Sequence, residues 1–229
     1  MRQLKRVFLL SIFVIMVGIG ASLTLKAAIG VGAWDALAQS ISFSTGIKVG
    51  TIAMILNSSC VLGQLLLLRK EFRLKHLLQL PIGILIGVVV NFIFYDVLGS
   101  ITIDSYVMNL LLLLVAYIII AASIAGIMLL DVVTFPLEGI CMAIANKMNW
   151  KFVVVRQSAD VISLVLVLII TFTMAIPLTI REGTVIGMLF FAPLMGFFMK
   201  LLEPGFRKLS LLNKQEEMIK VAKEPIKAI

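Results

Sequence analysis

The sequence predicts an all-α polytopic membrane protein, and three observations carry that prediction. Hydrophobic residues make up 61% of the 229 residues. Charged residues make up only 14%, against about 25% in an ordinary soluble domain. The mean hydropathy is +1.13, and the apolar residues gather into runs of about 20, which is the length that spans a bilayer core. A soluble globular enzyme and a disordered chain are therefore excluded.

Six apolar runs are long enough to span a membrane or nearly so. Five contain no charge, and the fifth in chain order carries Arg156 and Asp160 near its start. The first run is too long for a cleavable signal peptide and is not followed by a cleavage site of small residues, so we expect it to be the first transmembrane helix. The runs are Val7–Leu25, Val49–Leu68, Leu77–Tyr95, Tyr106–Leu130, Phe152–Ile176 and Gly183–Met199.

Two shorter amphipathic stretches interrupt this pattern. Ile29–Thr45 is opened by glycines, and Val132–Ala145 contains a proline in its first turn. A helix from Ala33 to Thr45 would be about 20 Å long at a rise of about 1.5 Å per residue, which is short of a bilayer core. We expect both stretches to be half-helices or re-entrant segments, which a membrane tolerates only inside protein or beside a cavity.

The distribution of basic residues predicts the orientation. If the N-terminus is cytoplasmic and only the six long runs span, 17 of the 20 Lys and Arg residues lie on the cytoplasmic side. The exceptions are Lys26, Lys48 and Arg181. If both short stretches also spanned, that number would fall to 14. The positive-inside rule thus favours six spans with both termini cytoplasmic. The net charge of +8 then reflects orientation on the lipid bilayer and does not indicate a nucleic-acid partner.

The two halves of the chain form a weak internal repeat. A shift of 103 positions places Glu138 on Asp35 and Asp160 on Asn57. Three spans per half is an odd number, so two such repeats must insert with opposite orientation, a plan that recurs in transporters. We predict repeats at 1–103 and 104–204, followed by a basic cytoplasmic tail at 205–229. Each half also carries two small residues four apart, which let helices approach closely: Gly83 and Gly87, and Gly183 and Gly187.

The two carboxylates related by the repeat, Asp35 and Glu138, are the first candidates for a functional site. Each occupies the third position of its short helix. One interpretation is structural, because a carboxylate in the first turn satisfies free amides and complements the helix dipole. The other is that these helix starts line a central cavity, as in transporters with broken helices. The two interpretations are compatible.

Asp160 lies within an apolar run, four residues after Arg156. Carboxylates inside a membrane face the bundle interior and mark proton or ion paths. The alternative is an ion pair at the cytoplasmic interface, with Arg156 snorkelling. Asn57 is the repeat partner of Asp160 and is a candidate for the same site, whereas Trp34 is either a cavity wall or an interfacial anchor.

The sequence offers no pattern for metal or cofactor chemistry. His76 is the only histidine, and Cys60 and Cys141 are far apart in apolar stretches. Neither a zinc site nor a disulfide framework is expected. Nucleotide-binding motifs and nucleophile–base motifs are absent, so we expect neither an enzyme nor a cofactor.

A pattern in the first half resembles the YczE/YyaS/YitT group of bacterial integral membrane proteins, most closely its YczE-like branch. In the second half Pro136, Glu138 and Gly139 take the place of a G-P-x-D-G stretch, with Glu for Asp, and the later T-G-x-x-x-G is replaced by Met148 and Asn149. The resemblance implies a multi-pass membrane protein, with transport or export of small molecules as its suggested activity. The matching positions of the first half are Gly20, Leu23, Ala27, Gly30, Trp34, Asp35, Leu37, Thr45, Gly46 and Gly50.

Two functions compete at this point. The first is a secondary transporter or exporter-like protein for an unidentified small molecule. A homodimer fits this function, because a single chain of this size encloses only a modest cavity. The second is a non-transporting accessory subunit whose glycine-bearing helix faces meet partner helices. The candidate binding residues of the first are Asp35, Glu138, Asp160, Asn57, Trp34 and Arg156.

Overall fold

The computed structural model describes residues 2–209, and this part of the chain is all-α, without a β-strand. The predicted fold class, an all-α polytopic membrane protein, is confirmed. Five stretches are long and apolar enough to cross a membrane. They are α1 (Arg2–Ala27), α3 (Val49–Leu68), α5 (Gln79–Asn91) continued by the π-helical η2 (Phe92–Val97), α6 (Tyr106–Leu130) and α8 (Phe152–Met174).

The last helix, α9 (Glu182–Lys208), is bent. Its halves, Glu182–Phe191 and Pro193–Lys208, meet at 42°, and together they are long and apolar enough for a sixth span if the bent pair crosses as one. Proline has no N–H for the helix ladder and its ring crowds the preceding turn, which accounts for a bend at this position. Because α9 continues to Lys208, the start of the predicted tail at 205 is helical, and residues 210–229 lie outside the described part.

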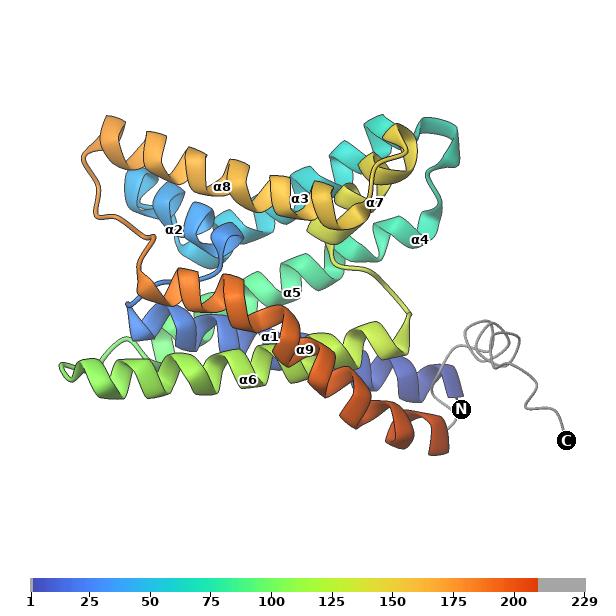
Figure 1. Ribbon diagram of the computed structural model, residues 1–229, viewed down its shortest axis with the longest axis horizontal. Helices are drawn as coiled ribbons and strands as arrows, with labels where there is room; N and C mark the ends of the chain where they lie inside the picture. Colours follow the sequence, from blue (N-terminus) through green and yellow to red (C-terminus); the bar gives the residue numbers. More distant parts are fainter. Residues whose placement is uncertain (1, 210–229) are drawn as a thin grey trace, which may run out of the picture.

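The two short helices keep the repeat register that the sequence predicts. Helix α2 (Ala33–Thr45) and helix α7 (Pro136–Met148) are 103 positions apart at both ends. The next long helices, α3 and α8, begin at Val49 and Phe152, again 103 positions apart. In Figure 1 the chain leaves α1, turns back toward the middle of the molecule and only then forms α2, and α7 does the same from the opposite end. Both helices are therefore re-entrant.

The termini of the long helices lie where a six-span arrangement requires them. The N-terminus of α1, the short helix α4 (Leu74–Leu77) and the C-terminal end of α9 share the right-hand end of Figure 1. The 3₁₀ turn η1 (Arg69–Glu71) that precedes α4 connects α3 to this end. Basic residues of these segments are thus gathered at one end of the molecule.

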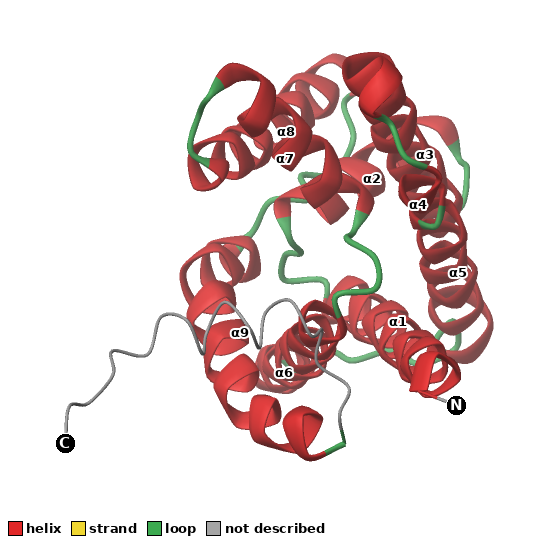
Figure 2. Ribbon diagram, turned by 90° about the vertical axis from the view of Figure 1, so that its right-hand side faces the viewer, coloured by secondary structure: helices red, strands yellow, loops and turns green. Residues whose placement is uncertain are grey.

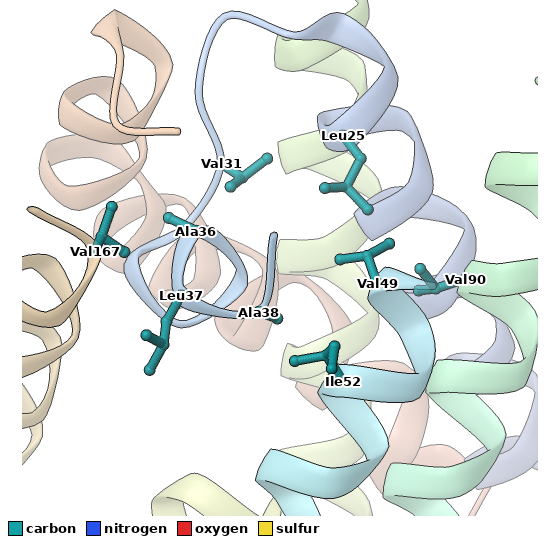
Figure 3. Close-up of a cluster of buried hydrophobic side chains, with 9 residues drawn as sticks. All are labelled: Leu25, Val31, Ala36, Leu37, Ala38, Val49, Ile52, Val90 and Val167. Carbon is teal, nitrogen blue, oxygen red and sulfur yellow. The ribbon is translucent and has the colours of Figure 1, made fainter. Parts of the chain in front are cut away.

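The two halves of the chain show the same pattern of helix packing, and each short helix packs on a long helix of the other half. Helices α1 and α6 pack together, α5 packs on α1 and α9 packs on α6. Helix α2 packs on α8 of the other half, and α7 packs on α3. Figure 3 shows the apolar cluster around α2, in which Val167 of α8 lies beside Ala36, with Leu37 and Ile52 nearby. Each short helix therefore packs on a long helix of the other half as well as on the next long helix of its own half.

One packing contact breaks this symmetry. Helices α3 and α5 pack closely, but the equivalent helices α8 and α9 make no comparable contact within residues 2–209. Figure 2, which looks along the long helices, shows α8 with α7 and α9 with α6 as separate pairs. The second half is therefore more open than the first.

Side chains from α5 and η2 hold the start of α3. The Gly50 N–H donates to Asn91 Oδ1 at 2.9 Å, and Asn91 Nδ2 donates to Thr51 Oγ1 at 2.9 Å. The Val49 N–H donates to the Tyr95 hydroxyl at 3.1 Å. These bonds satisfy amides that a helix start leaves free. The α3–α5 contact is thus fixed by polar groups as well as by close packing.

Left-handed residues end the long and short helices at equivalent places. Ala28 follows α1 at φ +54°, and Asp131 follows α6 at φ +45°. Gly46 follows α2 at φ +72°, and Asn149 follows α7 at φ +54°. This backbone region costs a non-glycine residue roughly 1–2 kcal/mol, so Ala28 carries a strain that glycine in its place would not.

We predict that Ala28→Gly raises the free energy of unfolding by about 1 kcal/mol, because glycine adopts positive φ without a Cβ clash. Thermal unfolding in detergent measures the change. The matched control is Ala27→Gly, one position earlier in the helix, which lowers stability by about 1 kcal/mol or more. A destabilised Ala28→Gly variant would contradict the strain argument.

We also predict that Asn91→Leu lowers the free energy of unfolding by about 1–3 kcal/mol, because the Gly50 amide and the Thr51 hydroxyl lose their partner. Tyr95→Phe removes a single hydrogen bond and is expected to cost about 1 kcal/mol. Thermal unfolding of both variants in the same detergent gives the comparison. Equal stability of Asn91→Leu and the unaltered chain would show that packing alone holds α3 to α5.

Candidate functional site

Arg156 joins the start of α7 to α8. Its Nη1 lies 2.5 Å from Asp160 Oδ1, one turn further along α8. Its Nε lies 3.3 Å from Glu138 Oε1 in the first turn of α7. The side chains of Arg156, Glu138 and Asp160 are 28%, 34% and 26% exposed. A guanidinium bridging two partly buried carboxylates fixes the short helix against the long one.

Asp35 brings the equivalent carboxylate of the first half close to this ion-pair cluster. It lies in the first turn of α2, within electrostatic range of Arg156 and Asp160. Within residues 2–209 it has no hydrogen-bond or ion-pair partner. A Cβ placed on Gly32 would lie 3.5 Å from Asp35 Oδ2, so the carboxylate folds back over the helix start. These four residues are called the charged cluster: Glu138 and Asp160 pair with Arg156, and Asp35 lies within electrostatic range of the guanidinium. With three carboxylates and one guanidinium, the cluster is acidic.

Trp34 lies inside the bundle beside the charged cluster. It packs against two apolar clusters, one that contains Leu37 and Val167 and one that contains Leu137 and Val155. Its indole Nε1 is buried, with no hydrogen-bond partner in the described part of the chain. Trp34 is therefore packed between apolar clusters of the described part, and its role as a cavity wall or an interfacial anchor stays a prediction.

The structure does not bring Asn57 into the charged cluster. A Cβ placed on Gly83 of α5 would lie 3.0 Å from Asn57 Cβ and 3.6 Å from its Nδ2. Gly50, Met54 and Asn57 follow one another at helical spacing on the face of α3 that meets α5. Asn57 therefore lies in the α3–α5 contact, which has no counterpart between α8 and α9, and a site shared with Asp160 stays a prediction.

The four predicted packing glycines all make close contacts within the chain. An added Cβ on Gly87 would lie 2.4 Å from the Gly50 carbonyl, and one on Gly83 would meet Asn57. An added Cβ on Gly183 would lie 2.7 Å from the Ile29 carbonyl, and one on Gly187 would lie 2.5 Å from the Tyr117 hydroxyl. These helix faces are occupied, so they do not supply the partner-facing surface of the accessory-subunit hypothesis.

A buried amide pair, Gln64 and Gln79, lies near the start of α7. Gln64 and Gln79 are 1% and 3% exposed. Gln64 Nε2 donates to Gln79 Oε1 at 2.8 Å, and Gln79 Nε2 donates to Gln64 Oε1 at 3.2 Å. Gln64 Nε2 also donates to the Pro136 carbonyl at 3.2 Å. The only signal in the sequence is a pair of glutamines in apolar surroundings.

The two cysteines come together although they are far apart in the sequence. Cys60 and Cys141 are both free and buried, and they belong to one apolar cluster with Leu137. No group of three or more His, Cys, Asp or Glu side chains in the described residues is placed to hold a metal ion.

Comparison with known proteins gives a family but no activity. The family of unknown function DUF6198 matches residues 4–200. The chain belongs to the DUF6198 family. No curated protein and no solved structure matches it. The DUF6198 match covers α1 to the middle of α9 and includes every residue of the charged cluster, while the resemblance to the YczE/YyaS/YitT group stays a prediction.

We predict that Arg156→Gln lowers the free energy of unfolding by about 1–3 kcal/mol, because two half-buried carboxylates lose their cation. This magnitude lies between the cost of breaking an exposed salt bridge and that of breaking a buried one. Glu138→Gln in the same chain is expected to recover part of this loss by removing one of the orphaned charges. Thermal unfolding of the two single variants and the double variant forms the cycle. Strictly additive effects would contradict the bridge between α7 and α8.

Proposed function

We propose that the protein is a secondary transporter or exporter-like protein of the bacterial cytoplasmic membrane that carries an unidentified small molecule. One observation carries the proposal: two half-length helices from opposite halves direct their N-terminal turns toward one cluster of ionisable residues. In inverted-repeat transporters, discontinuous helices end near the bilayer midplane and their termini form the substrate and ion site. Asp35, Glu138, Arg156 and Asp160 are the proposed binding residues, with Trp34 as a wall.

The charge of the cluster supports coupling to a proton or another cation. With three carboxylates and one guanidinium, the cluster carries an excess of negative charge when all four groups are ionised. Ionisable residues inside a membrane segment are costly, so they are retained where they serve a path for ions or protons. Asp160 and Glu138 compete for the same cation, Arg156, and a proton on either would weaken its half of the bridge.

The position of the basic residues supports the proposed topology. Arg69 and Arg73 beside α4 lie at the end of the molecule that also holds both chain termini of the described part. Arg181 lies in the connection at the opposite end of α8. By the positive-inside rule the first end is cytoplasmic.

A non-transporting accessory subunit is the second candidate, and the missing α8–α9 contact favours it. The outer faces of these helices expose large apolar side chains, among them Phe172 and Phe190. A partner helix or a second copy of the chain would pack there in place of the absent contact. Co-purification of a stoichiometric partner after mild detergent extraction would support this candidate.

Transport is tested in proteoliposomes loaded with a pH-sensitive dye and challenged with a panel of small amines, carboxylates and amino acids. We predict that at least one compound changes the internal pH and that Asp160→Asn reduces this signal at least tenfold, because the variant holds no exchangeable proton. Gln157→Ala, an exposed neighbour on α8, is the matched control and retains the signal. Proton coupling would be overturned by a compound that Asp160→Asn transports as fast as the unaltered chain does, and whose transport does not depend on a pH gradient.

A further inference from the structure

The start of each short helix is held by the other half of the chain, at two junctions. The α9 junction joins the loop before α2 to the start of α9. There the Gly183 N–H donates to the Ile29 carbonyl at 2.7 Å. Gly30, at φ +118°, lies so close to Thr184 that a Cβ would come within 2.6 Å of its backbone nitrogen. Only glycine fits this approach and this backbone conformation.

Side chains complete the α9 junction. Arg181 Nη1 donates to the Ala28 carbonyl at 2.7 Å, and the Tyr117 hydroxyl donates to the Gly183 carbonyl at 2.8 Å. The hydroxyls of Ser40 and Thr179 lie 2.8 Å apart, which ties α2 to the connection between α8 and α9. A cavity of about 110 Å³ lies beside the junction. Its lining includes Gln39, Phe43, Leu178 and Arg181.

The α5 junction is the counterpart at the other short helix, and it is built from amides. The reciprocal pair of Gln64 and Gln79 connects α3 to the start of α5, and Gln64 donates to the carbonyl of Pro136, the first residue of α7. A Cβ placed on Gly139 would lie 2.8 Å from the Gln64 amide atoms, so the helix start presses directly on the pair. Both junctions thus hold a short helix by its N-terminal end.

The charged cluster lies between the two junctions. Asp35 follows the loop of the α9 junction, and Glu138 stands two residues after Pro136 of the α5 junction. In the proposed topology the α5 junction lies toward the cytoplasm, next to Arg69 and Arg73, and the α9 junction lies toward the outside, next to Arg181. A path from either side to the cluster would pass one junction.

We propose that the α9 junction and the α5 junction are the outer and inner gates of the transport path, an inference that rests on the proposed transport function. The structure has both closed. Each gate is held by a few hydrogen bonds between neutral groups or from a single guanidinium, and such bonds are individually weak in net terms. Each can therefore open without unfolding the helices that it joins. Release of one gate while the other holds gives access from one side at a time.

Native cysteines report on the inner gate without any substrate. Cys60 and Cys141 are 8% and 2% exposed, on the packed helices α3 and α7 beside the α5 junction. Gln79→Met keeps the side-chain size but removes both hydrogen bonds of the amide pair. In inside-out vesicles we expect this variant to raise the rate at which a membrane-impermeant maleimide labels the cysteines about tenfold, equivalent to about 1.4 kcal/mol.

The outer gate is tested in right-side-out vesicles with Val31→Cys, a buried position that lines the cavity. This probe is placed in a chain in which Cys60 and Cys141 are serine. Arg181→Gln combined with Tyr117→Phe is expected to raise its labelling about tenfold, while the labelling of Cys141 from the inner side, measured in the chain with native cysteines, stays at its basal rate. Gln157→Ala is the control for both probes and changes neither rate.

Three results would overturn the two gates. Unchanged cysteine labelling in Gln79→Met removes the inner gate, and unchanged labelling of Val31→Cys in the double variant removes the outer one. A rise on both sides in either variant means that the bundle has loosened as a whole. If Gln79→Met is not monodisperse on size exclusion, Gln79→Asn, which separates the amides by one methylene, takes its place under the same criteria. Side-specific labelling without transport of any compound would show that each junction opens on its own side, but it would overturn their role as gates of a transport path.

Discussion

The ion bridge at Arg156 is the constraint on which the arrangement of the helices depends. A guanidinium in the first turns of a membrane helix needs counter-charges close by, and its own helix supplies only one, Asp160. The second, Glu138, comes from the start of α7. A carboxylate at a helix start can reach that depth only if the helix begins inside the bundle. The half-length of α7 is therefore a consequence of where its first turn has to lie.

A helix that begins inside the bundle imposes a further requirement on its connecting loop. The loop must carry unpaired backbone groups back from the membrane surface, and each needs a partner within the protein. The structure supplies these partners from the other half of the chain: Gly183, Arg181 and Tyr117 for the loop before α2, and Gln64 for the start of α7. The charged cluster requires short helices that begin inside the bundle, and the two junctions supply the partners that their connecting loops need. Neither short helix is held by its own half alone.

The sequence predicts the elements better than it predicts the faces that meet. Helix bounds follow from local signals, such as Pro136 at the start of α7 and the residues that end helices at positive φ, and these signals recur at a spacing of 103 positions. Asn57 is an example of a contact that the spacing does not predict. The same spacing pairs Asn57 with Asp160, but Asn57 lies on the face of α3 on which Gly50 and Met54 pack against α5. A glutamine inside an apolar helix favours an interhelical hydrogen bond, as Gln64 makes. Its partners, Gln79 and the Pro136 carbonyl, depend on the contact of three helices and leave no motif.

The difference between the halves decides which helices are free to move. In the first half, Asn91, Tyr95 and the close contact of Gly50 with Gly87 bind α3 to α5, so these two helices behave as one body. In the second half α8 and α9 lack such a contact, and α8 is held mainly by the short helices α2 and α7. Arg156 and Asp160 are both on α8, so a shift of this helix would move the guanidinium relative to Asp35 while leaving α3 and α5 in place. The repeat thus supplies two equivalent helix starts, and the missing α8–α9 contact leaves the helix that carries Arg156 and Asp160 less enclosed than its counterpart α3.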